Sequence, residues 1–325
     1  MSKRHILVTG GAGFIGSHLS ERLLGRGDRV SVLDNFNDFY DPVRKRSNVA
    51  PLLGRDDYRL VEGDIRDPQR VDTLFANSHF DAIVHLAARA GVRPSLEQPV
   101  LYEDVNCIGT LRLLEAARKH GPKLFIFGSS SSVYGINHKV PFTEGDPIEH
   151  PISPYATTKR TGELICYNYH HLYGLNISCL RFFTVYGPRQ RPEMAIHKFT
   201  DLLARGEAVP LFGDGSSRRD YTFISDIVDG IVRALDRAAA FEIFNLGGAE
   251  TTALGDLVRE IASALAVEPR IQYLPAQPGD VPITYADVRK AGHWLGYAPK
   301  VPIRQGLQRF VAWYKERAND APVRA

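Results

Sequence analysis

Short apolar runs alternate with amphipathic stretches along most of the chain. The runs are apolar throughout rather than in every second position, which is typical of parallel strands buried on both faces. They lie at residues 5–9, 29–33, 58–62, 82–86, 123–127, 176–181 and 241–246. This pattern predicts an α/β fold with a doubly wound parallel sheet that is covered by helices on both sides.

The amphipathic stretches between the runs have the apolar spacing of helices. They predict helices at 17–24, 99–120, 154–169, 195–205, 224–235, 254–265 and 303–314, and a further strand at 269–274. We expect a large domain at 1–182, to which 220–248 returns. A smaller α/β lobe is expected from 183–219 and 249–318, followed by a frayed tail at 319–325.

Composition excludes several classes of protein. Hydrophobic residues make up 44% of the 325 residues, and the net charge is only +3. The basic residues are not clustered, so we predict no nucleic-acid partner. No apolar run reaches membrane-spanning length, and we expect no signal peptide. Cys107, Cys166 and Cys179 have no metal-binding spacing, so they predict a reduced, cytoplasmic protein without a metal site.

The first apolar run leads directly into Gly10-Gly11-Ala12-Gly13-Phe14-Ile15-Gly16 and then into a helix. A strand, a glycine loop and a helix in this order are the context of a dinucleotide-binding motif. Gly10 permits the turn, Gly13 lets the backbone approach a pyrophosphate, and Gly16 lets helix and strand pack closely. The helix N-terminus then faces the phosphates. The sheet is therefore predicted to be of the Rossmann type.

Asp34 ends the second strand, near the position about 20 residues beyond the glycines where a carboxylate binds the cofactor ribose. A carboxylate there accepts both ribose hydroxyls and repels a 2′-phosphate, so it predicts NAD rather than NADP. The other candidate cofactor contacts follow the glycines or the ends of early strands: Phe14, Ile15, Asn35, Asp64, Ile65, Leu86, Ala87 and Ala88.

The stretch Ser153-Pro154-Tyr155-Ala156-Thr157-Thr158-Lys159 is the predicted centre of the chemistry. Ser153 can cap a helix whose first position suits Pro154, and Gly174 can end it. Tyr155 and Lys159 then lie one turn apart on the same face. A nearby ammonium favours the phenolate, so we expect Lys159 to lower the pKa of Tyr155. A second nearby cation, such as an oxidised nicotinamide ring, would complete the shift that makes Tyr155 a usable base.

Several hydroxyls follow the strand at 123–127, in Gly128-Ser129-Ser130-Ser131-Ser132-Val133-Tyr134-Gly135. Ligands of doubly wound sheets bind beyond the carboxyl ends of the strands, so these serines are predicted to line the site. Together with the glycine motif and Tyr155-x-x-x-Lys159, this segment resembles the nucleotide-sugar epimerases and dehydratases among the extended short-chain dehydrogenases/reductases. The resemblance covers nearly the whole chain. It implies bound NAD, a nucleotide-sugar substrate and Ser130 as the catalytic serine beside Tyr155 and Lys159.

The subgroups of this family differ after the catalytic serine. Dehydratases carry an Asp-Glu pair, because loss of water needs an acid and a base, whereas this chain has Ser131 and Ser132. UDP-glucuronate decarboxylases have a glutamate at the position of Ser132. Simple 4-epimerases need no extra pair, which fits serines. Thr184 and Arg191 resemble the UDP-glucuronate 4-epimerases.

The resemblance also implies a set of substrate contacts. Val209, Leu211 and Phe212 correspond to the segment around the uracil ring and ribose, and Arg219 corresponds to a diphosphate-binding arginine. Gln277-Pro278-Gly279-Asp280-Val281 is similar to the same subgroup. The implied substrate-binding residues are Ser130, Ser131, Ser132, Thr184, Arg191, Val209, Leu211, Phe212, Arg219 and Asp280.

These observations predict an NAD-dependent UDP-sugar 4-epimerase that interconverts UDP-glucuronate and UDP-galacturonate. Two alternatives act on related substrates, a UDP-glucose or UDP-N-acetylglucosamine 4-epimerase and a UDP-glucuronate decarboxylase. A third, from another class, is a non-catalytic NAD-sensing protein, against which the intact Ser130, Tyr155 and Lys159 argue. The resemblance further implies a homodimer formed through the helices at 99–120 and 154–174.

Overall fold

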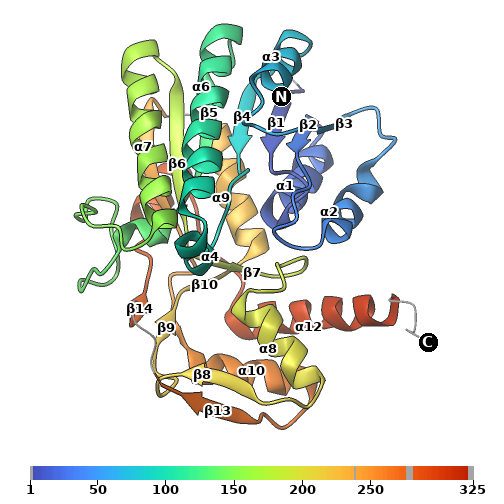
Figure 1. Cartoon of the computed structure of the whole chain (residues 1–325), viewed down its shortest axis with the longest axis vertical. Helices are drawn as coiled ribbons and strands as arrows, with labels where there is room; N and C mark the ends of the chain where they lie inside the picture. The colour runs from blue at the N-terminus through green and yellow to red at the C-terminus, as the bar shows by residue number, and fades with distance from the viewer. Residues whose placement is uncertain (1–2, 238, 276–280, 321–325) are drawn as a thin grey trace.

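The computed structural model describes residues 3–237, 239–275 and 281–320. Its centre is a seven-stranded sheet in the order β11-β6-β5-β4-β1-β2-β3, in which every neighbouring pair is parallel. The predicted α/β fold with a doubly wound sheet is confirmed (Figure 1). The strands are β1 His5–Thr9, β2 Arg29–Asp34, β3 Tyr58–Glu62, β4 Ala82–His85, β5 Leu124–Ser130, β6 Asn176–Phe182 and β11 Phe241–Leu246.

Both faces of the sheet are buried, because side chains alternate between two apolar clusters. Ile6 and Val8 of β1 belong to one cluster, and Leu7 between them belongs to the other. The first cluster packs under α1 (Phe14–Gly25) and α9 (Ile224–Asp236), which contact each other. The second packs under α3, α6 and α7, whose bounds are Pro68–Ala76, Gly109–His120 and Pro154–Tyr173. This double burial explains why the strands are apolar throughout.

The predicted helix at 99–120 consists of three consecutive parts. α5 (Pro99–Glu103) and α6 are joined by a π-helical turn at Asp104–Ile108. Asn106 in this turn is 2% exposed, and its amide accepts from the backbone N–H of Arg89 and donates to the backbone carbonyl of Arg89. A π-helical turn contains one more residue than an α-helical turn, and here it directs the buried amide of Asn106 at the segment that follows β4. The pattern of apolar positions could not reveal this.

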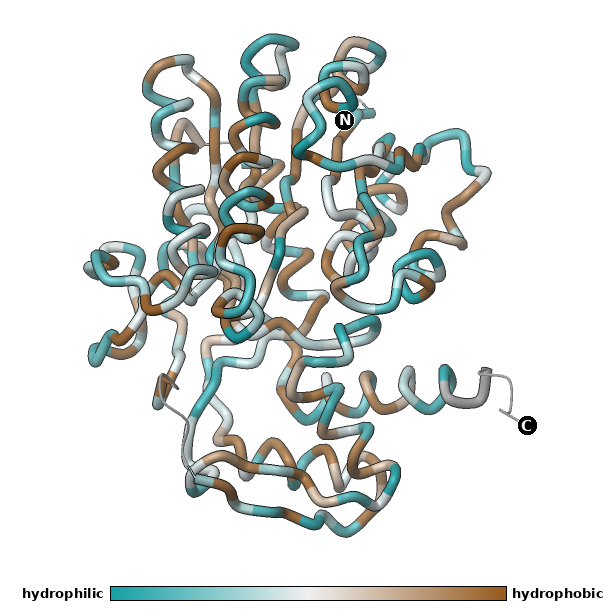
Figure 2. The backbone as a smooth tube through the Cα atoms, viewed as in Figure 1, coloured by the Kyte–Doolittle hydropathy of each residue, from teal (hydrophilic) through white to brown (hydrophobic). Residues whose placement is uncertain are grey.

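A smaller lobe lies below the sheet in Figure 1. It pairs β8 (Val209–Phe212) with β13 (Ile271–Leu274) and packs α8 (Ala195–Ala204) against α10 (Leu254–Leu265). In Figure 2, hydrophobic residues recur along β8 and α10. The chain returns to the large sheet through α9 and β11, which pairs with β6. The domain boundaries given above stay a proposal.

Several short elements were not predicted, because two or three residues carry too little periodicity. They connect the sheet to the smaller lobe: β7 Thr184–Tyr186, β9 Arg218–Arg219, β10 Tyr221–Phe223, β12 Thr252–Ala253 and β14 Ile283–Thr284. The helices α2 Pro42–Val49, α4 Val92–Glu97 and α11 Arg289–Leu295 were also missed. The last helix, α12 (Ile303–Asp320), extends past the predicted end at 314, and 321–325 lie outside the described residues.

Two further observations bear on the sequence analysis. Cys107, Cys166 and Cys179 are all buried and free of disulfide bonds. Within the part of the chain that the structure describes, no helix is both long enough and apolar enough to cross a membrane.

Candidate active site

A cavity of about 550 Å³ lies at the carboxyl ends of the central strands and reaches the smaller lobe. Most of the residues selected from the sequence line it, although they come from segments far apart in the chain. The predicted residues that line the cavity are Gly10, Gly13, Phe14, Ile15, Gly16, Asp34, Asn35, Asp64, Ile65, Leu86, Ala87, Ala88, Ser130, Ser131, Ser132, Tyr155, Lys159, Thr184, Arg191 and Arg219.

Three predicted substrate contacts are not brought to this cavity. Val209 and Leu211 are fully buried and belong to the apolar core, because alternate residues of β8 point inward. Their side chains therefore belong to the core, and the contact of this segment with the uracil ring and ribose, which the resemblance implies, stays a prediction. Phe212 is partly exposed and packs against the Arg93 guanidinium, 5.4 Å from the ring centre. Asp280 lies outside the described residues.

The glycine loop packs closely against its neighbouring backbone segments because it lacks side chains. Gly10 has φ +71°, and an added Cβ would lie 2.7 Å from the backbone nitrogen of Ala87. At Gly16 the added Cβ would lie 2.3 Å from the carbonyl oxygen of Gly10. α1 begins at Phe14, so its first N–H groups lie at the cavity. The loop therefore has the form that a pyrophosphate requires.

Two carboxylates, those of Asp34 and Asp64, line the same part of the cavity as the glycine loop. Asp34 is 7% exposed and accepts hydrogen bonds from the N–H groups of Ala12 (3.0 Å) and Phe36 (2.9 Å). Burial raises the pKa of Asp34. Burial also acts to raise the pKa of Asp64, but hydrogen bonds from Arg66 and Asn35 hold it at about 2. Both groups can accept hydrogen bonds from a bound ligand.

Tyr155 and Lys159 project from the first turns of α7. The helix starts as predicted, because the Ser153 hydroxyl accepts from the N–H of Ala156 (3.1 Å) and Pro154 occupies the first turn. It ends at Gly174, which has φ +68°. The Lys159 ammonium lies 6.0 Å from the Tyr155 ring centre and donates to the carbonyl of Gly128 at 2.7 Å. The lysine is 6% exposed.

The electrostatics of this pair differ from the expectation. Burial raises the pKa of Tyr155, and the opposing influences come from the Ser130 hydroxyl and the positive charge of Arg191. Burial lowers the pKa of Lys159 to about 8. In the protein without ligands, the pKa of Tyr155 is therefore raised, and the lowering expected from Lys159 is not found. The physical reason is that both groups lose water, while the ammonium of Lys159 is directed to Gly128.

The serine turn places alternate hydroxyls on opposite sides. The Ser130 and Ser132 hydroxyls lie 2.9 Å apart, and the N–H of Ser132 donates to the Ser130 oxygen. Ser129 points the other way, and its hydroxyl donates to Glu163 at 2.7 Å. β5 continues to Ser130, and successive side chains of a strand point to opposite faces. The Ser130 hydroxyl therefore lies beside Tyr155, whereas the Ser129 hydroxyl anchors the strand to Glu163.

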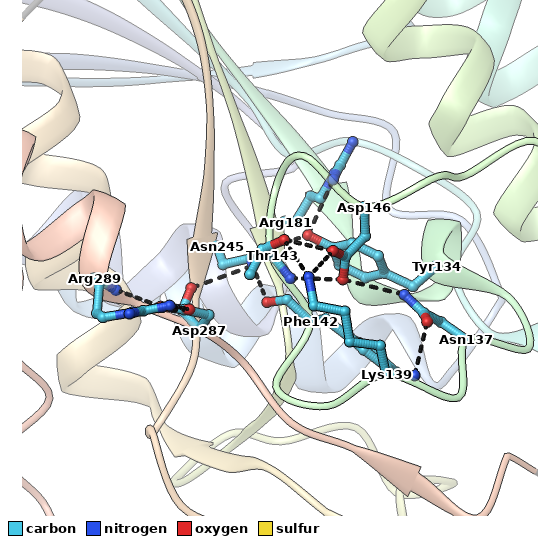
Figure 3. Close-up of polar contacts among 10 residues, drawn as sticks. All are labelled: Tyr134, Asn137, Lys139, Phe142, Thr143, Asp146, Arg181, Asn245, Asp287 and Arg289. Carbon is cyan, nitrogen blue, oxygen red and sulfur yellow. Dashed lines mark hydrogen bonds and ion pairs between the residues drawn. The ribbon is translucent and has the colours of Figure 1, made fainter.

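A buried polar network supports this turn from behind, and sequence reasoning missed it. Arg181 is 1% exposed and makes a bidentate pair with Glu163 at 2.8 Å. Arg181 also donates to the Tyr134 hydroxyl, which in turn donates to Asn245. Figure 3 shows Asn245 reaching the backbone of Phe142, a residue that lines the cavity. The sequence signal for this network is Arg181 itself, a charged residue within the apolar run at 176–181.

The loop that carries Phe142 is tied together by a single carboxylate. Asp146 accepts from the backbone N–H and the hydroxyl of Thr143, from the Asn137 amide and from the Lys139 ammonium. Figure 3 shows these donors surrounding it. Phe142 packs on Tyr134 with ring centres 4.8 Å apart. The wall of the cavity formed by Phe142 is therefore fixed to the sheet by both polar and aromatic contacts.

Basic side chains concentrate at the smaller-lobe side of the cavity. Arg191 is 18% exposed, pairs with Glu193 at 3.1 Å and lies 5.3 Å from the ring centre of Phe39. Arg219 and Arg93 line the same cavity. Phe39 and Arg93 were missed, because a single aromatic residue in a loop or a single arginine in a short helix carries no signal of its own.

The whole chain resembles proteins of known family. A family model described as GDP-mannose 4,6 dehydratase matches residues 7–310. The chain belongs to this family. The resemblance to extended short-chain dehydrogenases/reductases of the nucleotide-sugar epimerase group is thereby confirmed.

Relatives within this group are named as epimerases. The chain is 43% identical over 327 residues to UDP-glucuronate 4-epimerase 4 of Arabidopsis thaliana, covering 95% of this chain and 75% of that protein. The structure of UDP-glucuronic acid 4-epimerase from Bacillus cereus, in complex with UDP-glucuronic acid and NAD, has a TM-score of 0.89 and 35% identity. That comparison covers 96% of this chain and 99% of the other.

A neutral-sugar epimerase is structurally just as similar. UDP-glucose 4-epimerase from Thermotoga maritima, solved with UDP-glucose, has a TM-score of 0.90 and 35% identity. The comparison covers 97% of this chain and 99% of that chain. Overall fold therefore does not choose between a neutral and an acidic sugar, and the choice depends on the residues in the cavity.

Proposed function

We propose that this protein is an NAD-dependent UDP-sugar 4-epimerase that interconverts UDP-glucuronate and UDP-galacturonate. Arg191 is the observation that carries this substrate assignment. It lies in the cavity with Thr184, Ser131 and Ser132, and its guanidinium can form a bidentate pair with a C6 carboxylate. The named relatives support the same activity.

The residues of the glycine loop fit NAD. We propose that Gly10, Gly13 and Gly16 admit the pyrophosphate, that Asp34 binds the adenosine ribose and that Asp64 accepts from the adenine. Asp34 favours NAD, because a 2′-phosphate beside a buried carboxylate would be repelled. Bound NAD would accept a hydride from C4 of the sugar and return it to the opposite face.

This chain would supply the proton transfer and the orientation of the sugar. Tyr155 takes the proton of the 4-hydroxyl and later returns one, and Ser130 donates to the 4-oxygen. Lys159 leaves the Gly128 carbonyl or shares it in order to hold the nicotinamide ribose. The phenol needs help to ionise, because burial raises its pKa. The positive charges of the oxidised nicotinamide, Lys159 and Arg191 would supply that help.

Two features argue against the alternative reactions. Ser131 and Ser132 stand where dehydratases of this family carry an acid–base pair, so elimination of water lacks its catalysts. Ser132 also replaces the glutamate of the decarboxylases. A UDP-glucose or UDP-N-acetylglucosamine 4-epimerase stays the second candidate, supported by the similarity to the Thermotoga maritima enzyme.

We also propose a homodimer, formed through the helices around α6 and α7. α4, α5, α6 and α7 contact one another, but several of their large apolar side chains remain exposed. Val100 is 80% exposed, Leu172 64% and Leu96 62%. A second copy would cover them. Light scattering would give twice the monomer mass if this proposal is correct. Location in the cytoplasm stays a prediction from the cysteines.

Arg191→Ala tests the substrate assignment. Loss of one partner from a desolvated charge pair costs about 2–5 kcal/mol, so kcat/KM for UDP-glucuronate should fall roughly 30-fold or more. UDP-glucose has no carboxylate and should be affected much less. Both substrates are measured on the same variant, with products identified by NMR. Equal losses on the two substrates would show that Arg191 only shapes its loop, and the uronate assignment would be abandoned.

A further inference from the structure

One part of the cavity, the cofactor half, is lined by the glycine loop, Asp34 and Asp64, and the other, the substrate half, is lined by the serine turn at 130–132, Thr184 and Arg191. The loop between β2 and α2 crosses from the cofactor half to the substrate half. Its residues are joined in sequence by side-chain hydrogen bonds. The Asn35 amide donates to Asp64 (2.8 Å), and its oxygen accepts from the backbone N–H and the amide of Asn37. The Asn37 oxygen accepts from the N–H of Phe39 (3.1 Å). The loop therefore delivers Phe39 to a defined place in the cavity.

This loop has a second anchor and a backbone strain of its own. The ammonium of Lys45, which is 5% exposed, donates to the backbone carbonyl of Asn37 at 2.7 Å. Phe36 has φ +48°, a left-handed conformation that costs free energy for a residue with a side chain. Such a conformation persists where the surroundings impose it. The hydrogen bonds of Asn35 and Asn37 provide that constraint.

Two guanidinium groups lie over the Phe39 ring. Arg191 is 5.3 Å from the ring centre and Arg89 is 5.6 Å from it. Arg89 follows β4, and its backbone is held by Asn106. Arg191 follows β7 on the substrate side. A half-buried aromatic face attracts a guanidinium and fixes the plane in which it lies.

Among the described residues, Arg191 has few other contacts that could fix its orientation. Its Nε pairs with Glu193, which is 42% exposed, and its Nη2 meets the sulfur of Met194 at 3.4 Å. An exposed carboxylate and a thioether restrain a long side chain only weakly. Bidentate pairing with a carboxylate needs a defined guanidinium plane. The Phe39 ring is the flat surface that can define it.

We propose that Phe39 is a positioning residue that holds Arg191 in the plane required to bind the carboxylate of a UDP-uronate. The inference rests on the proposed function, because it assumes that Arg191 meets that carboxylate. It adds that selectivity for an acidic sugar depends on a loop from the cofactor half of the molecule. Phe39 itself need not touch the sugar.

Binding of nucleotide sugars to the NAD-containing protein tests this proposal. The measurements use a Tyr155→Phe background, so that the sugar is not turned over during calorimetric titration. Phe39→Leu keeps an apolar side chain but removes the aromatic face. It should weaken UDP-glucuronate binding roughly 3- to 10-fold and leave UDP-glucose binding unchanged. Phe39→Tyr keeps the face and should bind both sugars normally. Val43→Ala, an uncharged change at a side chain that is 68% exposed at the start of α2, is the matched control and should bind both sugars normally.

A double-mutant cycle shows whether Phe39 acts through Arg191. In protein that already carries Arg191→Ala, Phe39→Leu should cause no further loss of UDP-glucuronate binding. An equal loss of both sugars with Phe39→Leu, or a loss that persists without Arg191, would overturn the positioning role and leave the proposed function standing. If Arg191→Ala alone weakens both sugars equally, the proposed function fails, and this inference fails with it.

Discussion

Apart from Lys159, the cofactor half of the cavity is built from the first 90 residues, where the contacts follow the ends of successive strands. The substrate half is assembled from the serine turn at 130–132, the segment 184–191 and the short strands near Arg219 and Thr284. One half thus uses consecutive α/β units, and the other uses segments brought together by two lobes. Changes in the first half should therefore affect every substrate, and changes in the second should discriminate between them.

Phe39 is an exception to this division. It belongs to the cofactor half in sequence but contacts Arg191 of the substrate half. Substrate selectivity can therefore depend on residues of both halves. Substitutions in each half, beginning with Tyr155, on which both halves depend, can separate effects on the cofactor from effects on the choice of sugar.

Tyr155→Phe should have the largest effect. Loss of a positioned general base typically lowers kcat by roughly 10²–10⁴, and here UDP-glucuronate and UDP-glucose should lose the same factor. NAD should stay bound, because the hydroxyl contributes little to cofactor binding. The measurement is kcat for both sugars, together with the NAD released from denatured protein. A near-normal kcat would place the base on another residue.

Gly16→Ala should disrupt the cofactor half alone. The added Cβ would lie 2.3 Å from the carbonyl of Gly10 and 2.7 Å from Cα of Gly11, so α1 must move. We expect roughly 10- to 100-fold weaker NAD binding and an equal loss of activity for all substrates.

Gly25→Ala provides the control on the same helix. An added Cβ there meets no atom within 4 Å among the described residues. NAD binding should be unchanged in this variant, as measured by titration of nucleotide-free protein. Normal NAD affinity in Gly16→Ala would contradict the role given to the close approach of helix and strand.

Lys159→Met should make the nucleotide-free protein more stable at neutral pH while removing activity. Burial lowers the pKa of Lys159 from 10.5 to about 8, so the native state bears a cost for the charge below pH 8. Between pH 8 and 10.5 only the unfolded chain keeps the proton, and the wild-type protein regains stability as pH rises. After loss of the hydrogen bond to Gly128, we expect a gain of roughly 2 kcal/mol at pH 7.

Urea unfolding at pH 7 and at pH 10 measures this difference. The advantage of Lys159→Met over the wild type should shrink at the higher pH. Lys123→Met, at an exposed lysine, should show no such dependence on pH. If Lys159→Met is less stable than the wild type at both values, the hydrogen bond to Gly128 outweighs the cost of burying the charge.

Glu193→Gln should have the smallest effect, and only on acidic sugars. Glu193 pairs with Arg191 at 3.1 Å. Under the proposed function it would compete with the substrate carboxylate for the same guanidinium. An exposed ion pair contributes about 0.2–1 kcal/mol, so KM for UDP-glucuronate should fall by roughly 1.5- to 5-fold. KM for UDP-glucose should not change. A rise in both values would mean that Glu193 supports the loop rather than competing.

Local patterns in the sequence determined the large sheet and the backbone of the site. Continuous apolar runs identify strands buried on both faces, and the glycine motif follows from the close approaches at Gly10 and Gly16. The cap at Ser153 and the spacing of Tyr155 and Lys159 depend on neighbours within one or two helical turns. Each of these features is encoded by residues close together in the chain, so it can be read without the fold.

The tertiary structure decided the burial of those residues, their pKa values and their contacts with distant segments. The pKa of Tyr155 depends on burial, the alternation of β8 places Val209 and Leu211 in the core, and the contact between Phe39 and Arg191 joins two distant loops. The buried pair of Arg181 and Glu163 likewise links a strand to a helix. Desolvation and long-range contacts arise only when distant segments meet, and no local periodicity records which segments those are.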